Sequence, residues 1–158
     1  MNFRTVLQAS DIKAIAHILN STGFFYDHEV EVAVSLAEEN LEQGDDLSGY
    51  LFIMAEENEQ VIGYSCFGKT PSTEASYDLY WLGVNEENKG KGIGKILLSM
   101  TEKTIAELGG KNIWIETAGR PLYEPTRMFY LKTGCELVAE LPEFYGKGDD
   151  KVIFLKKV

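Results

Sequence analysis

The sequence predicts one α/β domain that spans residues 1–158. Aromatic and β-branched residues fill short segments such as 78–84, as in buried strands, whereas apolar residues recur at helical spacing over 93–105. A glycine-rich turn joins these two segments. The chain has 158 residues, of which 44% are hydrophobic and 25% charged, so it is long enough for one well-buried domain and short for two.

The chain is acidic, with a net charge of −10. Outside the glycine-rich turn it has no basic stripe, so we expect no nucleic-acid or membrane partner, and we expect cationic molecules to be attracted. No apolar run reaches the ~20 residues of a membrane helix, and the N-terminus lacks a signal-peptide core, which predicts a cytoplasmic protein. Cys66 and Cys135 have no CxxC spacing and no clustered His, so we expect reduced core thiols and no metal site.

The N-terminal part is predicted to hold one strand and two helices. Residues 3–7 have the composition of a strand, and Ser10 is placed to cap a helix whose apolar residues share one face. A second helix is expected over about 29–42. Asp27 is its predicted cap and Gly44 its predicted end.

The middle of the chain is predicted to form a hairpin followed by a strand, a turn and a helix. Segments 51–55 and 61–67 read as antiparallel strands, and they lead into the strand over 78–84. The next helix carries its apolar residues on one face over 93–105. The glycines at 109–110 are expected to end it.

The C-terminal part is predicted to hold a strand, a short helix and a hairpin. Segment 112–116 reads as the strand, and the short helix runs from Pro125 in its first turn to a stop at Gly134. Segments 136–141 and 152–155 are expected to pair as the last two strands.

The turn Lys89-Gly90-Lys91-Gly92-Ile93-Gly94-Lys95 predicts an anion-binding site. Glycines let the backbone approach a ligand, and the N–H groups and dipole of a helix start favour negative charge. A steric turn with solubilising lysines is the plainer alternative. A P-loop is excluded because Gly90 to Lys95 is one residue short of GxxxxGK and Ile96 supplies no hydroxyl.

A dinucleotide-binding fold is a weaker alternative for the same turn. Glu116 ends the next strand at about the distance of a ribose-binding acid. The spacing argues against it, because GxGxxG would place its third glycine at Lys95. In addition, five residues separate Val84 from Gly90, where that fold uses a very tight turn.

Two motifs, in order, resemble those of the GNAT N-acetyltransferases. Segment 89–98 resembles the family's acetyl-CoA loop, (Gln or Arg)-x-x-Gly-x-(Gly or Ala), and segment 125–135 resembles its Asn-x-x-Ala-x-x-Phe-Tyr-x-x-x-Gly-Phe helix. The match covers roughly residues 60–158. The sequence departs from the two patterns at four positions, where Lys89 replaces Gln or Arg, Tyr123 replaces Asn, Thr126 replaces Ala and Cys135 replaces the final Phe.

The resemblance implies an α/β GNAT fold, with a central mixed sheet of six to seven strands flanked by about four helices. It also implies an enzyme that transfers the acetyl group of acetyl-CoA to a primary amine and releases CoA. The residues that it assigns to coenzyme binding are Leu82, Gly83, Val84, Lys89, Gly90, Lys91, Gly92, Ile93, Gly94, Lys95, Thr126 and Tyr130.

The resemblance and the chemistry of acetyl transfer suggest three catalytic residues. An ammonium with a pKa near ~10.4 must lose a proton before it attacks, so a base is needed. Asp78 is the first candidate for this base and Glu116 the second. The alternative for each is that it is an ordinary surface carboxylate with no catalytic role. Tyr130 matches the family's tyrosine and is the expected acid for the CoA thiolate, with an ordinary helix tyrosine as the alternative.

The acceptor site is expected in two places. Phe24, Phe25 and Tyr26 read first as core packing beneath two helices, but by analogy they line the acceptor channel, which His28 would then touch. Segment 144–150 reads first as a hairpin turn. By the same analogy, its Tyr145 and Asp149 (or Asp150) border the amine.

The sequence leaves the acceptor and the assembly open. A free amino acid, a polyamine, an aminoglycoside, a peptide N-terminus and a protein lysine all fit as acceptors. A non-catalytic acyl-CoA-binding or sensor module is the main alternative to an enzyme. A homodimer is common in the family the chain resembles.

Overall fold

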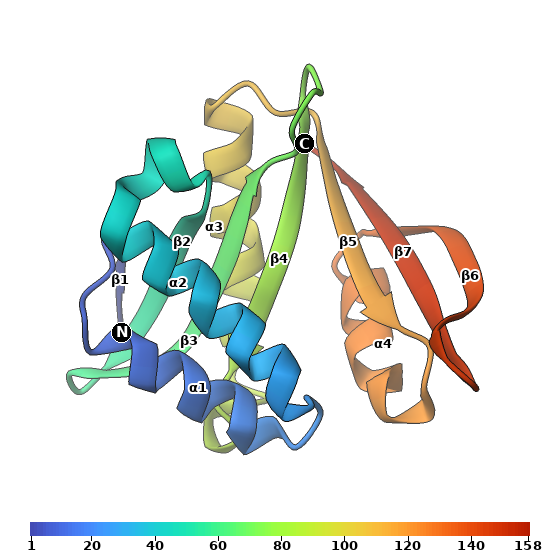
Figure 1. Ribbon diagram of the computed structural model, residues 1–158, viewed down its shortest axis with the longest axis horizontal. Helices are drawn as coiled ribbons and strands as arrows, with labels where there is room; N and C mark the ends of the chain where they lie inside the picture. The colour runs from blue at the N-terminus through green and yellow to red at the C-terminus, as the bar shows by residue number, and fades with distance from the viewer. The chain divides into compact units, whose positions relative to one another are not determined.

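The computed structural model describes residues 1–158, which form two compact units (Figure 1). Unit 1 comprises Met1–Gly68 and Tyr80–Lys103, and unit 2 comprises Lys69–Leu79 and Thr104–Val158. Two strands and one helix contribute residues to both units.

Seven strands and four helices make an α/β fold with a mixed sheet, as predicted. The helices are α1 (Asp11–Thr22), α2 (Asp27–Ser48), α3 (Ile93–Glu107) and α4 (Glu124–Lys132). The strands are β1 (Asn2–Arg4), β2 (Leu51–Glu57), β3 (Gln60–Lys69), β4 (Ser76–Val84), β5 (Asn112–Ala118), β6 (Glu136–Gly146) and β7 (Asp149–Lys157). Their order in the sheet is β1-β2-β3-β4-β5-β7-β6, with β4 and β5 parallel.

The first strand is shorter than predicted, and Ser10 does not cap α1 with its side chain. The next residue, Asp11, takes over the local hydrogen bonding. Its buried carboxylate accepts the Gln8 N–H at 2.7 Å and pairs with the Arg4 guanidinium at 2.5 Å. A carboxylate in the first helical turn also suits the helix dipole.

Helix α2 differs from its prediction at both ends. It begins at Asp27, so Asp27 is not the cap, and the preceding Tyr26 N–H donates to Glu29 Oε1 at 3.0 Å. Gly44 kinks the helix, with φ of 80°, instead of ending it. The helix ends before Gly49, whose left-handed φ of 74° is typical of a C-terminal stop.

The two hairpins are antiparallel, as predicted, with longer strands than expected. In the first, Asn58 and Glu59 both have positive φ, which suits a two-residue turn. In the last, β6 extends to Gly146 and β7 begins at Asp149, so the predicted turn is confined to Lys147 and Gly148 and the rest of segment 144–150 is strand. A register irregularity between Leu141 and Gly146 accommodates the extra residues.

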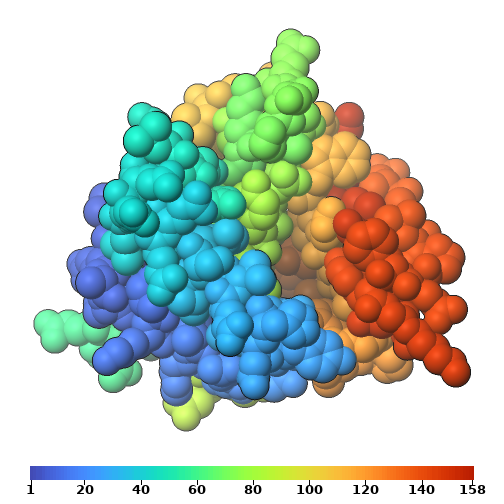
Figure 2. Space-filling model, viewed as in Figure 1, coloured from blue at the N-terminus to red at the C-terminus, as the bar shows by residue number.

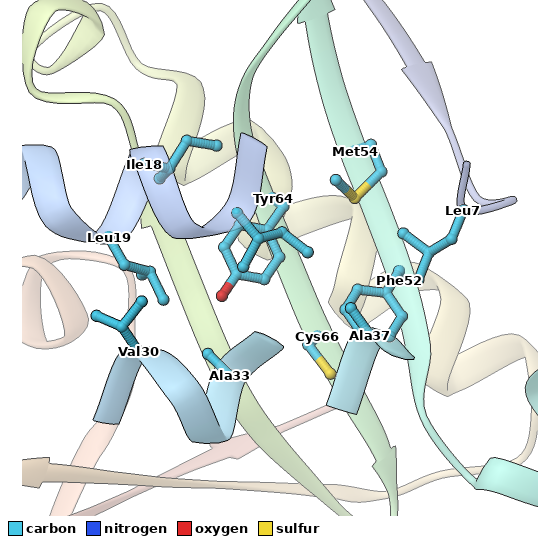
Figure 3. Packing of buried hydrophobic residues seen from close by; sticks show 11 residues of the cluster. Leu7, Ile18, Leu19, Val30, Ala33, Ala37, Phe52, Met54, Tyr64 and Cys66 are labelled. Atoms are coloured by element: carbon cyan, nitrogen blue, oxygen red, sulfur yellow. The ribbon is translucent and has the colours of Figure 1, made fainter. Parts of the chain in front are cut away.

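The core of unit 1 lies on both faces of its strands. Even-numbered residues of β3, such as Tyr64 and Cys66, pack against α1 and α2 (Figure 3). Gly63 and Ser65 face α3, where the Ser65 hydroxyl lies 2.9 Å from the Thr101 hydroxyl and Gly63 lies close to Leu97. Figure 2 shows α2, in blue to cyan, running across the visible surface of this unit.

The core of unit 2 forms where α4 packs against β5 and β7. The Tyr130 ring lies 5.6 Å from the Phe154 ring, centre to centre. The Arg127 guanidinium donates to the carbonyl oxygens of Ala118 (2.8 Å) and Arg120 (2.9 Å), which fixes the helix to the end of β5. None of the four helices has the length and apolar character needed to cross a bilayer.

We predict that Tyr64→Phe stabilises the protein. The Tyr64 hydroxyl is buried with no hydrogen-bond partner, beside the apolar side chains of α1 and α2 (Figure 3). An unpaired buried hydroxyl costs about 1–3 kcal/mol, so its removal should raise the free energy of unfolding by about 1 kcal/mol in urea titrations. Ser65→Ala is the matched control, since it removes a paired buried hydroxyl and should lower stability. A loss of stability in Tyr64→Phe would contradict the prediction.

Candidate active site

The loop between β4 and α3 in unit 1 has its glycines where the backbone requires them. Gly90 and Gly92 have φ of 78° and 82°, a left-handed conformation that disfavours any side chain. A Cβ added at either position would meet nothing within 4 Å, so packing does not select these glycines. The loop therefore follows a left-handed backbone path that suits glycine, with open space beside it.

The start of α3 supplies hydrogen-bond donors to that space. The first bond at the start of the helix runs from the Ile96 N–H to the Gly92 carbonyl oxygen at 3.1 Å. The N–H groups of Ile93, Gly94 and Lys95 precede it and have no acceptor within the helix. With the exposed Lys91 and Lys95, these donors suit the diphosphate of a coenzyme.

Lys89 is engaged within unit 1. Its ammonium lies 2.6 Å from Glu86 Oε2 and 4.3 Å from the centre of the Phe24 ring. The sequence prediction counted Lys89 with the coenzyme-binding residues and missed Glu86. Glu86 is three residues before Lys89, a spacing at which opposite charges often meet.

The end of β4 carries the three predicted coenzyme residues Leu82, Gly83 and Val84. Gly83 is buried, and a Cβ there would lie 3.2 Å from side-chain atoms of Ile18 and Leu19. Gly83 thus lets α1 approach the strand closely, while Leu82 and Val84 are half-buried.

The aromatic residues before α2 divide into packed and exposed ones. The Phe25 ring packs edge-on against Trp81, 5.3 Å between centres, as the core interpretation predicted. Tyr26 is 53% exposed and stacks on His28, so the core interpretation is wrong for it. Its place next to the first turn of α2 directs it away from the core. Phe24 contacts Lys89 of the glycine loop.

Asp78 and Glu116 lie on one face of the strands in unit 2. Asp78 of β4 is opposite Trp114 of β5, and Glu116 follows Trp114 by two residues, which returns its side chain to the same face. Burial raises the pKa of Asp78, the hydrogen bond from the Thr70 hydroxyl at 2.7 Å opposes this rise, and the charge of Glu116 adds to it. The two candidate bases therefore interact electrostatically.

Glu116 has a partner that the sequence prediction missed. The Lys151 ammonium lies 2.9 Å from Glu116 Oε1 and 4.3 Å from the centre of the Phe144 ring. Lys151 is 13% exposed at its side chain, whereas Glu116 is mostly exposed. The pairing is not evident from sequence because it depends on the register between β5 and β7, which places Lys151 opposite Ala118.

Tyr130 lies on the opposite face of unit 2 from Asp78. It packs on Phe154, which pairs with Ile115, and strand alternation puts Ile115 on the other side from Trp114. Burial raises the pKa of Tyr130, with a smaller contribution from Cys135, so the phenol keeps its proton. Thr126, on the same helix, is half-buried.

The other predicted acceptor residues lie near the end of the last hairpin, whose tip projects from unit 2 (Figure 2). Asp149 Oδ2 pairs with the Arg120 guanidinium at 3.3 Å, a partner that the sequence prediction also missed. Tyr145 is half-exposed, with its ring edge-on to Phe144. Asp150 accepts the Glu143 N–H at 2.8 Å and so supports the hairpin itself.

The predicted site residues thus fall into two groups. Unit 1 holds the glycine loop, the end of β4 and the aromatic residues before α2. Unit 2 holds the two carboxylates, the buried tyrosine and the end of the last hairpin.

Comparison with protein families identifies the fold and its loop. Residues 12–134 match the family model described as the acetyltransferase (GNAT) family. The chain belongs to the GNAT family. Acetyl-CoA is the acetyl donor of GNAT enzymes, and the donors at the start of α3 fit its diphosphate. A comparison with curated protein sequences finds no significant match.

Solved structures agree with the family assignment. A protein from Desulfovibrio desulfuricans assigned to the GNAT family is 38% identical, with a TM-score of 0.96 over 99% of this chain and 98% of that one. An aminoglycoside 6′-N-acetyltransferase in complex with coenzyme A is 19% identical, with a TM-score of 0.76 over 99% and 97%. The ribosomal-protein-S18-alanine N-acetyltransferase of Escherichia coli is 16% identical, with a TM-score of 0.77 over 99% and 93%. The last two likenesses bear on the fold alone.

We predict that Gly92→Ala weakens CoA binding in this GNAT protein. A side chain at φ of 82° should cost about 1 kcal/mol of stability and displace the loop N–H groups, lowering CoA affinity about tenfold in calorimetry. Gly109→Ala is the matched control. Gly109 has φ of 89° and equally open surroundings at the other end of α3, so the substitution should lower stability but not CoA affinity. Equal CoA affinities in the two variants would contradict the prediction.

Proposed function

We propose that this GNAT protein is an N-acetyltransferase that moves the acetyl group of acetyl-CoA to a primary amine. The observation that carries the proposal is the pair of left-handed glycines, Gly90 and Gly92, at the start of α3 in a member of this family. The N–H groups that follow them at the start of α3 have no acceptor within the helix, as in a phosphate-binding loop.

The coenzyme-binding residues of this proposal are those of the glycine loop, together with the end of β4 and, in unit 2, Thr126 and Tyr130. Bound acetyl-CoA would supply an activated acetyl group as a thioester. The loop N–H groups and the exposed Lys91 and Lys95 would neutralise phosphate charge. The N–H groups are rigid donors because they belong to the start of a helix.

Asp78 is the proposed base for the acceptor amine. Partial burial raises its pKa, which makes it a stronger proton acceptor than an exposed aspartate while the Thr70 hydroxyl holds Oδ2 in place. Glu116 is the second candidate. Its carboxylate already pairs with Lys151, a cation of the chain itself, so Asp78 is preferred.

Tyr130 is the proposed acid for the departing thiolate. A buried phenol with a raised pKa is protonated across the neutral range, as an acid must be. The rings of Phe129 and Phe154 lie 5.3 and 5.6 Å away, centre to centre, and limit the movement of its ring.

We also propose that residues 1–158 work as one domain in the cytoplasm. The family match takes in residues of both units, which favours a single functional domain. Cys66 and Cys135 are buried thiols and neither forms a disulfide, which suits a reducing compartment.

The deciding experiment mixes the protein with acetyl-CoA and a panel of primary amines and follows the release of free thiol. Amine-dependent thiol release, with the acetylated amine found by mass spectrometry, is the expected result. CoA binding in calorimetry without transfer to any amine would point instead to an acyl-CoA-binding or sensor module. Absence of CoA binding would refute the proposal.

We predict that Tyr130→Phe lowers turnover and leaves CoA affinity unchanged. The ring packing on Phe154 is retained, whereas the donated proton is lost, so kcat should fall about a hundredfold. Tyr77→Phe, a second buried tyrosine of unit 2, is the matched control and should keep its turnover. Steady-state kinetics and CoA calorimetry measure the two effects. Equal turnover in both variants would exclude Tyr130 as the acid.

We predict that Glu116→Gln moves the acidic limb of the pH profile of kcat/KM to lower pH. The charge of Glu116 raises the pKa of Asp78, so removing that charge lets Asp78 ionise at lower pH. The Lys151 ammonium, no longer paired with a carboxylate, also lowers the pKa of Asp78. Glu140→Gln is the control, because Glu140 pairs with Val152 on the opposite face and should leave the limb unmoved. An unmoved limb in Glu116→Gln would count against Asp78 as the base.

A further inference from the structure

Lys151 occupies a cation site that belongs to the protein itself. Its side chain is 13% exposed, and its ammonium lies between Glu116 Oε1, at 2.9 Å, and the Phe144 ring, at 4.3 Å from the centre. A carboxylate beside an aromatic face is a combination that binds ammonium ions well. Glu116 and Phe144 thus form an ammonium site whose occupant is a side chain of β7.

This cation site lies next to the proposed base. Asp78 is opposite Trp114, and Glu116 is two residues further along β5 on the same face, a step of about 6.6 Å along a strand. The charge of Glu116 contributes to the raised pKa of Asp78, so the two carboxylates are close enough to interact. An acceptor amine bound at Asp78 would therefore extend toward Lys151 if its carbon chain lay along β5.

Two carboxylates near the end of β5 on this face are paired with cations, whereas Asp78, opposite Trp114, is not. Lys151 pairs with Glu116, and Arg120 pairs with Asp149. Asp78 accepts a hydrogen bond from the neutral Thr70 hydroxyl and makes no ion pair. One carboxylate therefore remains for the ammonium of an acceptor. The neighbouring side chains on the same face are apolar and half-buried, and they are Trp114, Ile153 and Leu155.

We propose that Lys151 makes the acceptor site selective for amines that carry a single positive charge on an apolar body. This inference rests on the proposed N-acetyltransferase activity. The reacting ammonium gives its proton to Asp78 before attack, so it is neutral when it reacts. A second ammonium keeps its proton and meets the like charge of Lys151 at the place where Glu116 would otherwise bind it.

The test compares amines of equal length that differ by one charge, pentylamine and 1,5-diaminopentane, with the four- and six-carbon pairs as length controls. The wild-type protein should prefer the monoamine. Lys151→Met removes the charge but keeps an apolar stem, so Glu116 becomes free for the second ammonium. The ratio of kcat/KM for diamine over monoamine should then rise about tenfold, mainly through KM.

Lys151→Arg is the matched control. It keeps the charge and should keep the wild-type ratio. Calorimetry gives a readout without turnover, since 1,5-diaminopentane should bind the Lys151→Met protein about tenfold more tightly than the wild type. Glu116→Gln tests the same idea in the opposite direction. Glu116→Gln leaves the Lys151 charge unpaired, so the ratio of kcat/KM for diamine over monoamine should fall below the wild-type value. This variant provides the test if Lys151→Met does not fold.

Two results would overturn the inference while leaving the proposed function intact. One is a wild-type protein that prefers the diamines. The other is a diamine ratio that stays the same in folded Lys151→Met and in Glu116→Gln. Failure of the wild-type protein to acetylate any amine is a different result, because it refutes the proposed function and this inference together.

Discussion

The left-handed backbone at Gly90 and Gly92 is the constraint on which the functional part of unit 1 depends. It allows β4 to turn into α3, with open space beside the two glycines. Those donors have no partner within the helix, and an unpaired donor is costly unless water or a ligand accepts from it. The loop therefore suits an anion, and the lysines beside it add positive charge in a chain that is otherwise strongly acidic.

Much of this arrangement could be predicted from sequence because it is local. The glycine loop, the short helix from Pro125 and the order of strands and helices all depend on residues close together in the chain. The same local reasoning failed at Gly44, which kinks α2 rather than ending it, and at Ser10, where the buried carboxylate of Asp11 makes the hydrogen bond. A neighbouring contact overrode the local preference at Ser10, and a longer helix overrode it at Gly44.

The partners of the site residues could not be predicted, because they depend on strand register. Lys151 reaches Glu116, and Arg120 reaches Asp149, only because β7 begins at Asp149 and runs antiparallel to β5. A hairpin with its turn spread over ten residues, as the sequence suggested, would leave that register undefined. The sequence thus suggested Glu116 and Asp149 as candidate site residues but not the cations with which they pair.

The contact between Lys89 and Phe24 joins two parts of unit 1 that are far apart in the chain. One ammonium group is shared by the carboxylate of Glu86 and an aromatic ring of the segment before α2. Any anion that drew this ammonium toward the glycine loop would take a stabilising contact from that segment. An anion in the loop would in that case loosen the α1–α2 connection through a single side chain.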